Sequence, residues 1–148
     1  QPSADGGKIY VACNRGDEIL EIDTESWSLL RKFHSGRGPY NLDLTPDGRL
    51  LVATLNQGGQ VEVFDLATGE SRGRAMSSTT VSHGVAVTPD SRFAFISIEG
   101  VGAEPGRVDV IDLSDVKLVG SAEVGQQAGG ITFWRMQSGD QSDSGQQY

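Results

Sequence analysis

The sequence has little from which to build a cross-linked, helical or membrane-spanning protein. Cys13 is the only cysteine among 148 residues, so no disulfide can form within the chain. No apolar run approaches the roughly 18 residues that a membrane span needs. Apolar residues alternate instead of recurring every three or four positions, so no helix of useful length is predicted. These absences favour a fold made of short strands.

Positive charge is also scarce. The chain has 12 basic and 20 acidic residues, a formal net charge of −8. Because it contains no basic patch or tail, we expect neither nucleic acid nor an anionic membrane as its main partner. No metal-ligand spacing and no GxSxG nucleophile elbow is present. We therefore predict no metal, no cofactor and no catalytic residue. Cys13 lies in an apolar stretch, where a thiol usually acts as a small buried hydrophobe.

Glycine is abundant by contrast, at 20 residues, and one motif recurs. Thr45-Pro46-Asp47-Gly48-Arg49 returns about 43 residues later as Thr88-Pro89-Asp90-Ser91-Arg92. An apolar-aspartate pair likewise ends a strand pattern at Asp23, Asp65 and Asp112. A repeat of about 40–45 residues with four strands per unit is typical of a β-propeller blade.

Short alternating runs between turn residues predict twelve strands. Their ranges are 8–14, 19–23 and 27–34, then 40–44, 50–55, 61–65 and 70–76, then 84–87, 93–98, 108–112 and 116–124, and finally 130–134. The last run, GITFW, aligns with GVAVT at 84–88, the innermost strand of the preceding unit. It would supply the innermost strand of a blade whose other three strands lie at residues 8–34.

The predicted fold class is all-β: a β-propeller with three four-stranded blades per chain. Residues 1–7 are assigned as a polar lead-in and 8–136 as the three-blade unit. Residues 137–148 are low in complexity and polar, and we predict a flexible tail there. We expect Trp27 and Trp134 to pack between blades.

KIYVACN (8–14), ILEID (19–23) and GRGPYNLDLTPDG (36–48) resemble the YVTN family of β-propeller repeats. The resemblance covers about residues 8–134 and is specific for architecture. It implies blades around a central axis. Members of that family include surface-layer proteins and relatives of lactonases and of the haem d1 domain of nitrite reductase. We predict a binding or scaffold module, and the resemblance permits a lactonase-like or quinone- or haem-linked enzyme as the alternative.

Three blades are too few to close a ring, since typical propellers have about four to eight. An open wedge would leave apolar faces and strand edges in water. We predict a two-fold homodimer with six blades, in which Gly130–Trp134 of one chain completes the Lys8–His34 blade of the other by strand exchange. The alternatives are a piece of a larger propeller and an open head-to-tail polymer. The lack of a TPDG-type turn after Trp134 favours a chain that ends there.

The chain starts at Gln1 without an initiator methionine, so processing of a secreted protein or excision from a longer one is expected. The predicted compartment is extracellular or periplasmic.

A propeller binds its ligands where loops gather at the mouth of the central channel. The predicted contacts in those loops are Arg15, Arg37, Tyr40, Asn41, Asn56, His83, Glu99 and Arg107. His83 is the sharpest candidate, as a metal ligand or general base, but a histidine bonded to a loop carbonyl is the more ordinary interpretation. The predicted function is non-enzymatic binding of a ligand or protein at this mouth.

Overall fold

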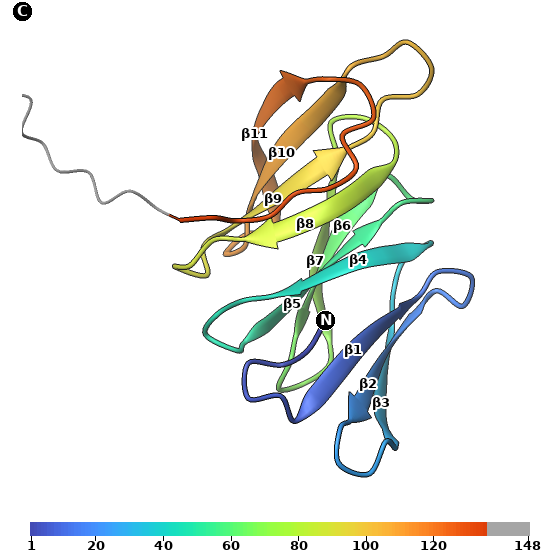
Figure 1. Cartoon of the computed structure of the whole chain (residues 1–148), viewed down its shortest axis with the longest axis vertical. Coiled ribbons are helices and arrows are strands. Elements are labelled where there is room, and N and C mark those ends of the chain that lie inside the picture. The colour runs from blue at the N-terminus through green and yellow to red at the C-terminus, as the bar shows by residue number, and fades with distance from the viewer. Residues whose placement is uncertain (136–148) are drawn as a thin grey trace, which may run out of the picture.

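The computed structural model describes residues 1–135, and these form eleven strands and no helix (Figure 1). That part of the chain holds no helix long and apolar enough to cross a membrane. The strands are β1 (Lys8–Cys13), β2 (Glu18–Asp23), β3 (Leu29–His34), β4 (Pro39–Leu44), β5 (Leu50–Leu55), β6 (Gln60–Asp65), β7 (Ser71–Met76), β8 (Ser82–Val87), β9 (Phe93–Ile98), β10 (Gly106–Asp112) and β11 (Lys117–Val124). The predicted tail at 137–148 lies outside the described residues.

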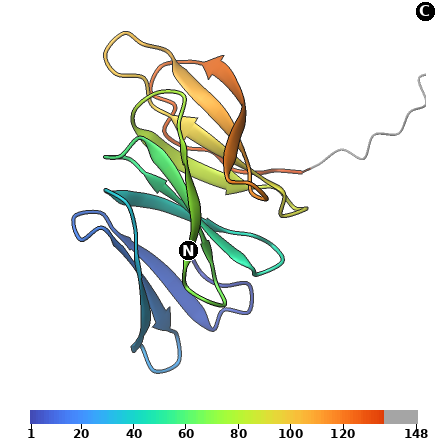
Figure 2. The same ribbon diagram turned by 180° about the vertical axis from the view of Figure 1, so that it is seen from behind.

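The strands form three antiparallel sheets, β1-β2-β3, β4-β5-β6-β7 and β8-β9-β10-β11. Each strand pairs with the next one in the chain, and the three sheets follow one another along the length of the molecule (Figures 1 and 2). The all-β prediction is confirmed, and the sheets are consistent with propeller blades. We call them blades 1, 2 and 3 in chain order.

The turn between the first two strands of a blade is built by a hydroxyl and a carboxylate. In blade 2 the Thr45 hydroxyl donates to the Asp47 carboxylate over 2.6 Å and accepts the Leu50 amide over 2.9 Å. The Arg49 amide donates to the same carboxylate over 3.0 Å. Residues 88–93 of blade 3 repeat these bonds. The recurring motif therefore has a structural role, which is to close this hairpin.

Blade 1 contains a third copy of this turn, which the sequence pattern did not predict. The Ser3 hydroxyl donates to Asp5 over 2.6 Å and accepts the Lys8 amide over 2.9 Å. Before the turn, Pro2 forms a bridge with Ile9 on the free edge of β1. The residues predicted only as a polar lead-in thus occupy the end of the innermost-strand position of blade 1.

The core lies between the blades and not within one sheet. Blades 1 and 2 bury Tyr10, Ile19, Phe33, Leu51, Ala53 and Phe64 against each other. The ring centroids of Phe33 and Phe64 lie 5.5 Å apart in an edge-to-face arrangement. A larger cluster, including Leu50, Val52, Val61, Val63, Ile96, Ile98 and Ile111, fills the space between blades 2 and 3. Stability therefore comes mainly from blade faces packed on neighbouring blades.

A buried carboxylate secures the connection into blades 2 and 3. Glu62 on β6 accepts the Gly36 amide over 2.8 Å and also bonds Ser71 and Arg74. Asp109 on β10 takes the same position in blade 3 and accepts the Ser78 amide over 2.7 Å. Each carboxylate holds the segment that crosses from the preceding blade, so its polar atoms are satisfied although it is fully buried.

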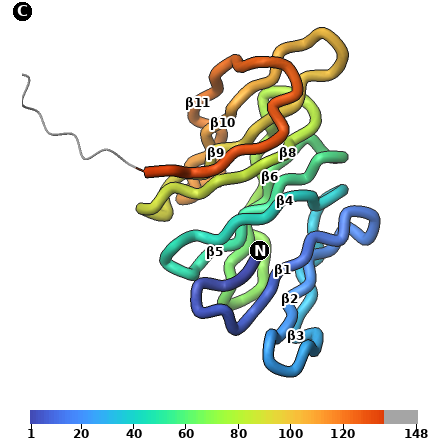
Figure 3. Tube along the Cα trace, in the orientation of Figure 1, coloured from blue at the N-terminus to red at the C-terminus, as the bar shows by residue number. Residues whose placement is uncertain are grey.

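The strand predicted at 130–134 is not formed. Residues 127–135 have no regular secondary structure. The segment nevertheless runs beside β8 (Figure 3). The Gly129 carbonyl accepts the Ser97 hydroxyl over 2.9 Å, just as the His83 carbonyl accepts the Thr54 hydroxyl over 2.7 Å. The segment thus takes the place beside blade 3 that β8 takes beside blade 2. Within residues 1–135 no second strand pairs with it, so no ladder forms.

Candidate functional site

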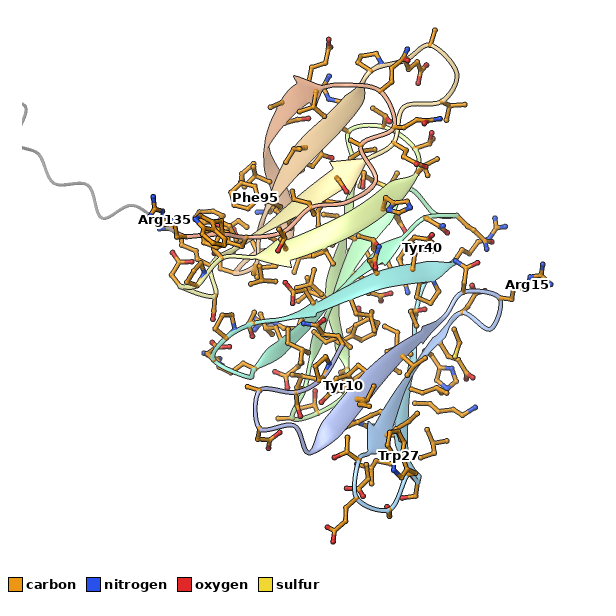
Figure 4. All side chains as sticks on the ribbon, in the orientation of Figure 1. Tyr10, Arg15, Trp27, Tyr40, Phe95 and Arg135 are labelled. Atoms are coloured by element: carbon orange, nitrogen blue, oxygen red, sulfur yellow. The ribbon has the colours of Figure 1, made fainter. Side chains whose placement is uncertain are left out.

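The candidate site is the end of the sheets opposite the Thr45 and Thr88 turns. Because adjacent strands are antiparallel, the other connections collect at this end. They are residues 14–17, 35–38, 56–59, 77–81, 99–105 and the segment after β11. Figure 4 shows Arg15 and Tyr40 towards the same side of the molecule. The loops that were predicted to line a channel mouth lie at this end.

An amide network joins the loops of blades 1 and 2. The Asn14 side-chain amide donates to the Asn56 side-chain oxygen over 3.1 Å, and Gln57 donates to Asn14 over 2.9 Å. The Asp17 carboxylate accepts the Gly38 amide over 2.8 Å. Asn56 was predicted as a ligand contact, and here its side chain also holds two loops together. Asn14, Asp17 and Gln57 were missed, because only the folded chain brings these loops together.

Tyr40, Asn41 and His83 meet between blades 2 and 3. The Tyr40 ring lies 4.6 Å from the His83 imidazole, centroid to centroid. The Asn41 side chain donates to the His83 carbonyl over 3.1 Å. His83 Nδ1 lies 2.7 Å from the Gly129 carbonyl oxygen, which can only accept, so Nδ1 carries the proton. This bond is the ordinary role that the sequence offered for His83.

The Nδ1 bond leaves His83 Nε2 with its lone pair available. Nε2 makes no hydrogen bond to any residue from 1 to 135. Beside it, Tyr40 is 44% exposed and presents both a ring face and a hydroxyl. This pair is therefore suited to contact a ligand that has a polar group beside a flat or apolar one.

Arg15 and Arg37 are the unengaged cations of this end. Both are exposed, and neither forms an ion pair or a side-chain hydrogen bond within residues 1–135. A guanidinium presents five donors that suit carboxylate and phosphate groups. The two side chains can therefore receive an anionic group without first breaking an internal pair in that part of the chain.

The remaining predicted contacts are Glu99 and Arg107. The Glu99 amide bonds the Val81 carbonyl over 3.1 Å. Arg107 lies on β10, where its Nε donates to Ser121 over 2.9 Å and its guanidinium lies 3.8 Å from the Glu123 carboxylate. Arg107 is thus turned towards the outer strand of its own blade and is not brought together with Tyr40 and His83.

Groups with shifted pKa values lie away from the mouth. Burial alone would raise the pKa of Glu21, but hydrogen bonds and charge from Lys8 and Arg31 outweigh it and lower that pKa. The hydroxyl of Thr45 lowers the pKa of Asp47, and Thr88 does the same to Asp90. All of these groups support the fold. Within residues 1–135 no three His, Cys, Asp or Glu side chains are placed to hold a metal ion.

No family model matches the chain, and no curated protein matches it in sequence. Solved structures do match its fold. Hydrazine synthase from Kuenenia stuttgartiensis superposes with a TM-score of 0.78 at 20% identity, over 84% of this chain and 36% of that one. A functionally unknown protein from Desulfotomaculum acetoxidans DSM 771 gives 0.72 at 16% identity, over 82% and 38%. At such identities the likeness shows the fold alone, and the chain spans under two-fifths of each structure's length.

Proposed function

We propose that this chain is a non-enzymatic binding module of the β-propeller type that takes an anionic ligand at its loop-rich end. One observation carries the proposal: Arg15 and Arg37 are exposed and without a partner in the described chain, at the end where the Tyr40 and His83 rings meet at a tilted angle. In a chain of net charge −8, these two guanidinium groups are available to pair with a negative charge, although Asp17 and Glu99 lie in loops of the same end. The hydrogen bond between Asn14 and Asn56 ties the loop that contains Arg15 to the loop that follows β5.

The ligand that fits is a small carboxylate or phosphate with a flat or apolar face. A guanidinium would pair with the charged group, and the Tyr40 ring would cover the flat part. His83 Nε2 would accept a hydroxyl or amide proton from the ligand. None of these roles requires a bond in the ligand to be broken, so binding suffices as the function.

Titration calorimetry on the intact chain with phenyl phosphate, 4-hydroxybenzoate and citrate, the last a carboxylate without a flat face, tests the proposal. We expect one of these probes to bind, and Arg37→Ala to weaken its binding at least tenfold, because a charge-assisted pair contributes about 1.5–3 kcal/mol. Arg72→Ala, on the exposed strand β7, is the matched control and should leave binding unchanged. The proposal fails if no probe binds, or if Arg37→Ala and Arg72→Ala weaken binding equally.

We also propose that two chains form one six-bladed ring. Its support is the three-blade wedge itself, whose first and last blades each lack a neighbour on one side within the described chain. Complete strand exchange through Gly130–Trp134 meets an obstacle. In the aligned register Phe133 would lie opposite Ile9, and Pro2 already occupies that place. The partner's segment would therefore have to displace Gln1–Ser3, so ring closure must rely largely on the blade faces.

A further inference from the structure

At each contact between blades, the outer strand of one blade packs against the turn that precedes the outer strand of the next blade. Between blades 1 and 2, Arg31 on β3 donates to the Leu66 carbonyl over 2.7 Å. Gly69 lies in that turn, and a Cβ placed on it would be only 2.9 Å from the Arg31 guanidinium. A large side chain on the strand therefore meets a glycine in the turn.

Between blades 2 and 3 the sizes are reversed. Gly73 on β7 takes the strand position, and a Cβ placed on it would lie 3.7 Å from the Val116 Cβ. Val116 lies in the turn of blade 3 and is 8% exposed. Both contacts pair one larger residue with one glycine. The glycine lies in the turn at the first contact and on the strand at the second.

The strand register identifies the equivalent residues at the two ends of the wedge. Arg31 pairs with Glu21, Gly73 with Val63 and Gly120 with Val110, each directly after a bulge. Gly120 thus holds the strand position at the far side of blade 3. In the turns, Trp27, Gly69 and Val116 are equivalent and have φ angles of 53°, 79° and 53°. Trp27 therefore holds the turn position at the free side of blade 1.

Trp27 is a large residue without a covering neighbour. It is 70% exposed, and its positive φ is unfavourable for a residue with a side chain. The predicted packing of Trp27 between blades is thus not met within one chain. Gly120 offers the complementary space, because a Cβ there would meet only Val110 of its own blade within 4 Å.

The surrounding faces are also apolar and incompletely covered. On blade 1, Ile9, Val11 and Ile22 occupy the positions that Leu51, Ala53 and Phe64 fill in the fully buried face of blade 2. On blade 3, Phe93, Phe95, Val108 and Val110 correspond to the buried Leu50, Val52, Val61 and Val63. Trp27 and Phe95 lie towards opposite ends of the molecule in Figure 4. The wedge thus ends in two unpartnered blade faces.

We infer that these two faces bind each other between two copies of this chain, with Trp27 of one copy packed over Gly120 of the other. The inference rests on the proposed six-bladed ring and assigns the contact that closes it. The pairing of one large residue with one glycine, seen at both internal contacts, is what selects a second copy as the partner. A two-fold ring contains this contact twice.

Light scattering of four proteins on a sizing column tests the contact: the intact chain, Trp27→Gly, Gly120→Arg and the double variant. Gly120→Arg places a side chain where Trp27 would sit, so we expect the dimer to be lost. Trp27→Gly leaves a hole, and we expect the dimer to dissociate at least tenfold more readily. The double variant recreates the Arg31–Gly69 pair of the first internal contact, so dimerisation should return.

Folding of the variants is checked by thermal unfolding of each monomer. Trp27→Gly relieves a positive φ, and Gly120 has room for a side chain, so neither change should unfold the wedge. A dimer that all three variants leave intact overturns the Trp27–Gly120 contact but not the ring. An intact chain that is monomeric overturns both. Binding of the anionic probes at the loop-rich end is measured separately and decides the proposed function by itself.

Discussion

The Ser97 hydroxyl donates a hydrogen bond of 2.9 Å to the carbonyl oxygen of Gly129. The same hydroxyl accepts the Gly84 amide over 2.9 Å, so it joins β8, β9 and the segment after β11. Thr54 makes the equivalent two bonds between Asn41 and His83. A buried hydroxyl on the second strand therefore fixes where the innermost strand of the next blade begins.

Ser97→Ala should loosen the segment that follows Gly129. It removes two hydrogen bonds, which at about 1 kcal/mol each predicts a loss of about 1–3 kcal/mol in unfolding free energy. We expect chymotrypsin to cut after Phe133 several-fold faster. Ser97→Thr copies Thr54 and should restore the normal rate. Equal cleavage of Ser97→Ala and the unmodified chain would mean that this bond does not hold the segment.

Glu62→Ala should destabilise the chain more than any exposed acid does. The change removes the carboxylate partner of the Gly36 amide, the Ser71 hydroxyl and the Arg74 guanidinium. We expect a loss of about 2–4 kcal/mol, measured by urea unfolding, because Glu62 is fully buried while Arg74 still reaches solvent. Glu70→Ala, on the exposed turn before β7, is the control and should change the midpoint little. Similar midpoints for the two variants would contradict the assigned role.

Thr45→Val should weaken the hairpin turn of blade 2. It removes the bonds to Asp47 and from the Leu50 amide while keeping a β-branched side chain. A loss of about 1–2 kcal/mol is expected in urea unfolding. Thr45→Ser should retain most of the stability, since Ser3 forms the same turn in blade 1. Equal unfolding free energies for Thr45→Val and Thr45→Ser would mean that the hydroxyl does not close the turn.

The Glu21 carboxylate makes stability depend on pH in a definite direction. Lys8 and Arg31 hold the pKa of Glu21 below its ordinary 4.5 despite burial. A group whose folded pKa is lowered contributes stability above its unfolded pKa and loses it as pH falls through the folded pKa. The stability difference between the unmodified chain and Glu21→Gln should therefore be constant from pH 7 to pH 6 and shrink below about pH 4.5. Urea unfolding at pH 6, 4 and 3 measures it. A difference that grows on acidification would contradict the assignment.

Most of the fold could be predicted because its turn chemistry repeats. The predicted strands at 50–55 and 93–98 coincide with β5 and β9, and both follow a Thr-Pro-Asp turn. Ser3–Asp5 escaped notice because serine and alanine replace threonine and proline in the motif. The strand predicted at 130–134 had the right alternation, but a ladder needs a neighbouring strand, and no alternation in one segment provides it.

The candidate site was predictable only as a set of loops. Tyr40 and His83 follow from their place at the start of innermost strands, and the structure brings them into contact. The pairing of Asn14 with Asn56 joins two blades, and the sequence contains no local signal for it. Arg107 was assigned to a loop, but β10 begins at Gly106, so its side chain follows the strand and reaches Ser121.

The proposed ring requires two chains in the assembled molecule. Sedimentation equilibrium of the intact chain over a hundredfold range of concentration measures this number. We expect one species at twice the 15.7 kDa chain mass, with both blade faces covered and six blades in the ring. A species at the mass of one chain throughout that range would contradict the ring and the Trp27–Gly120 contact together.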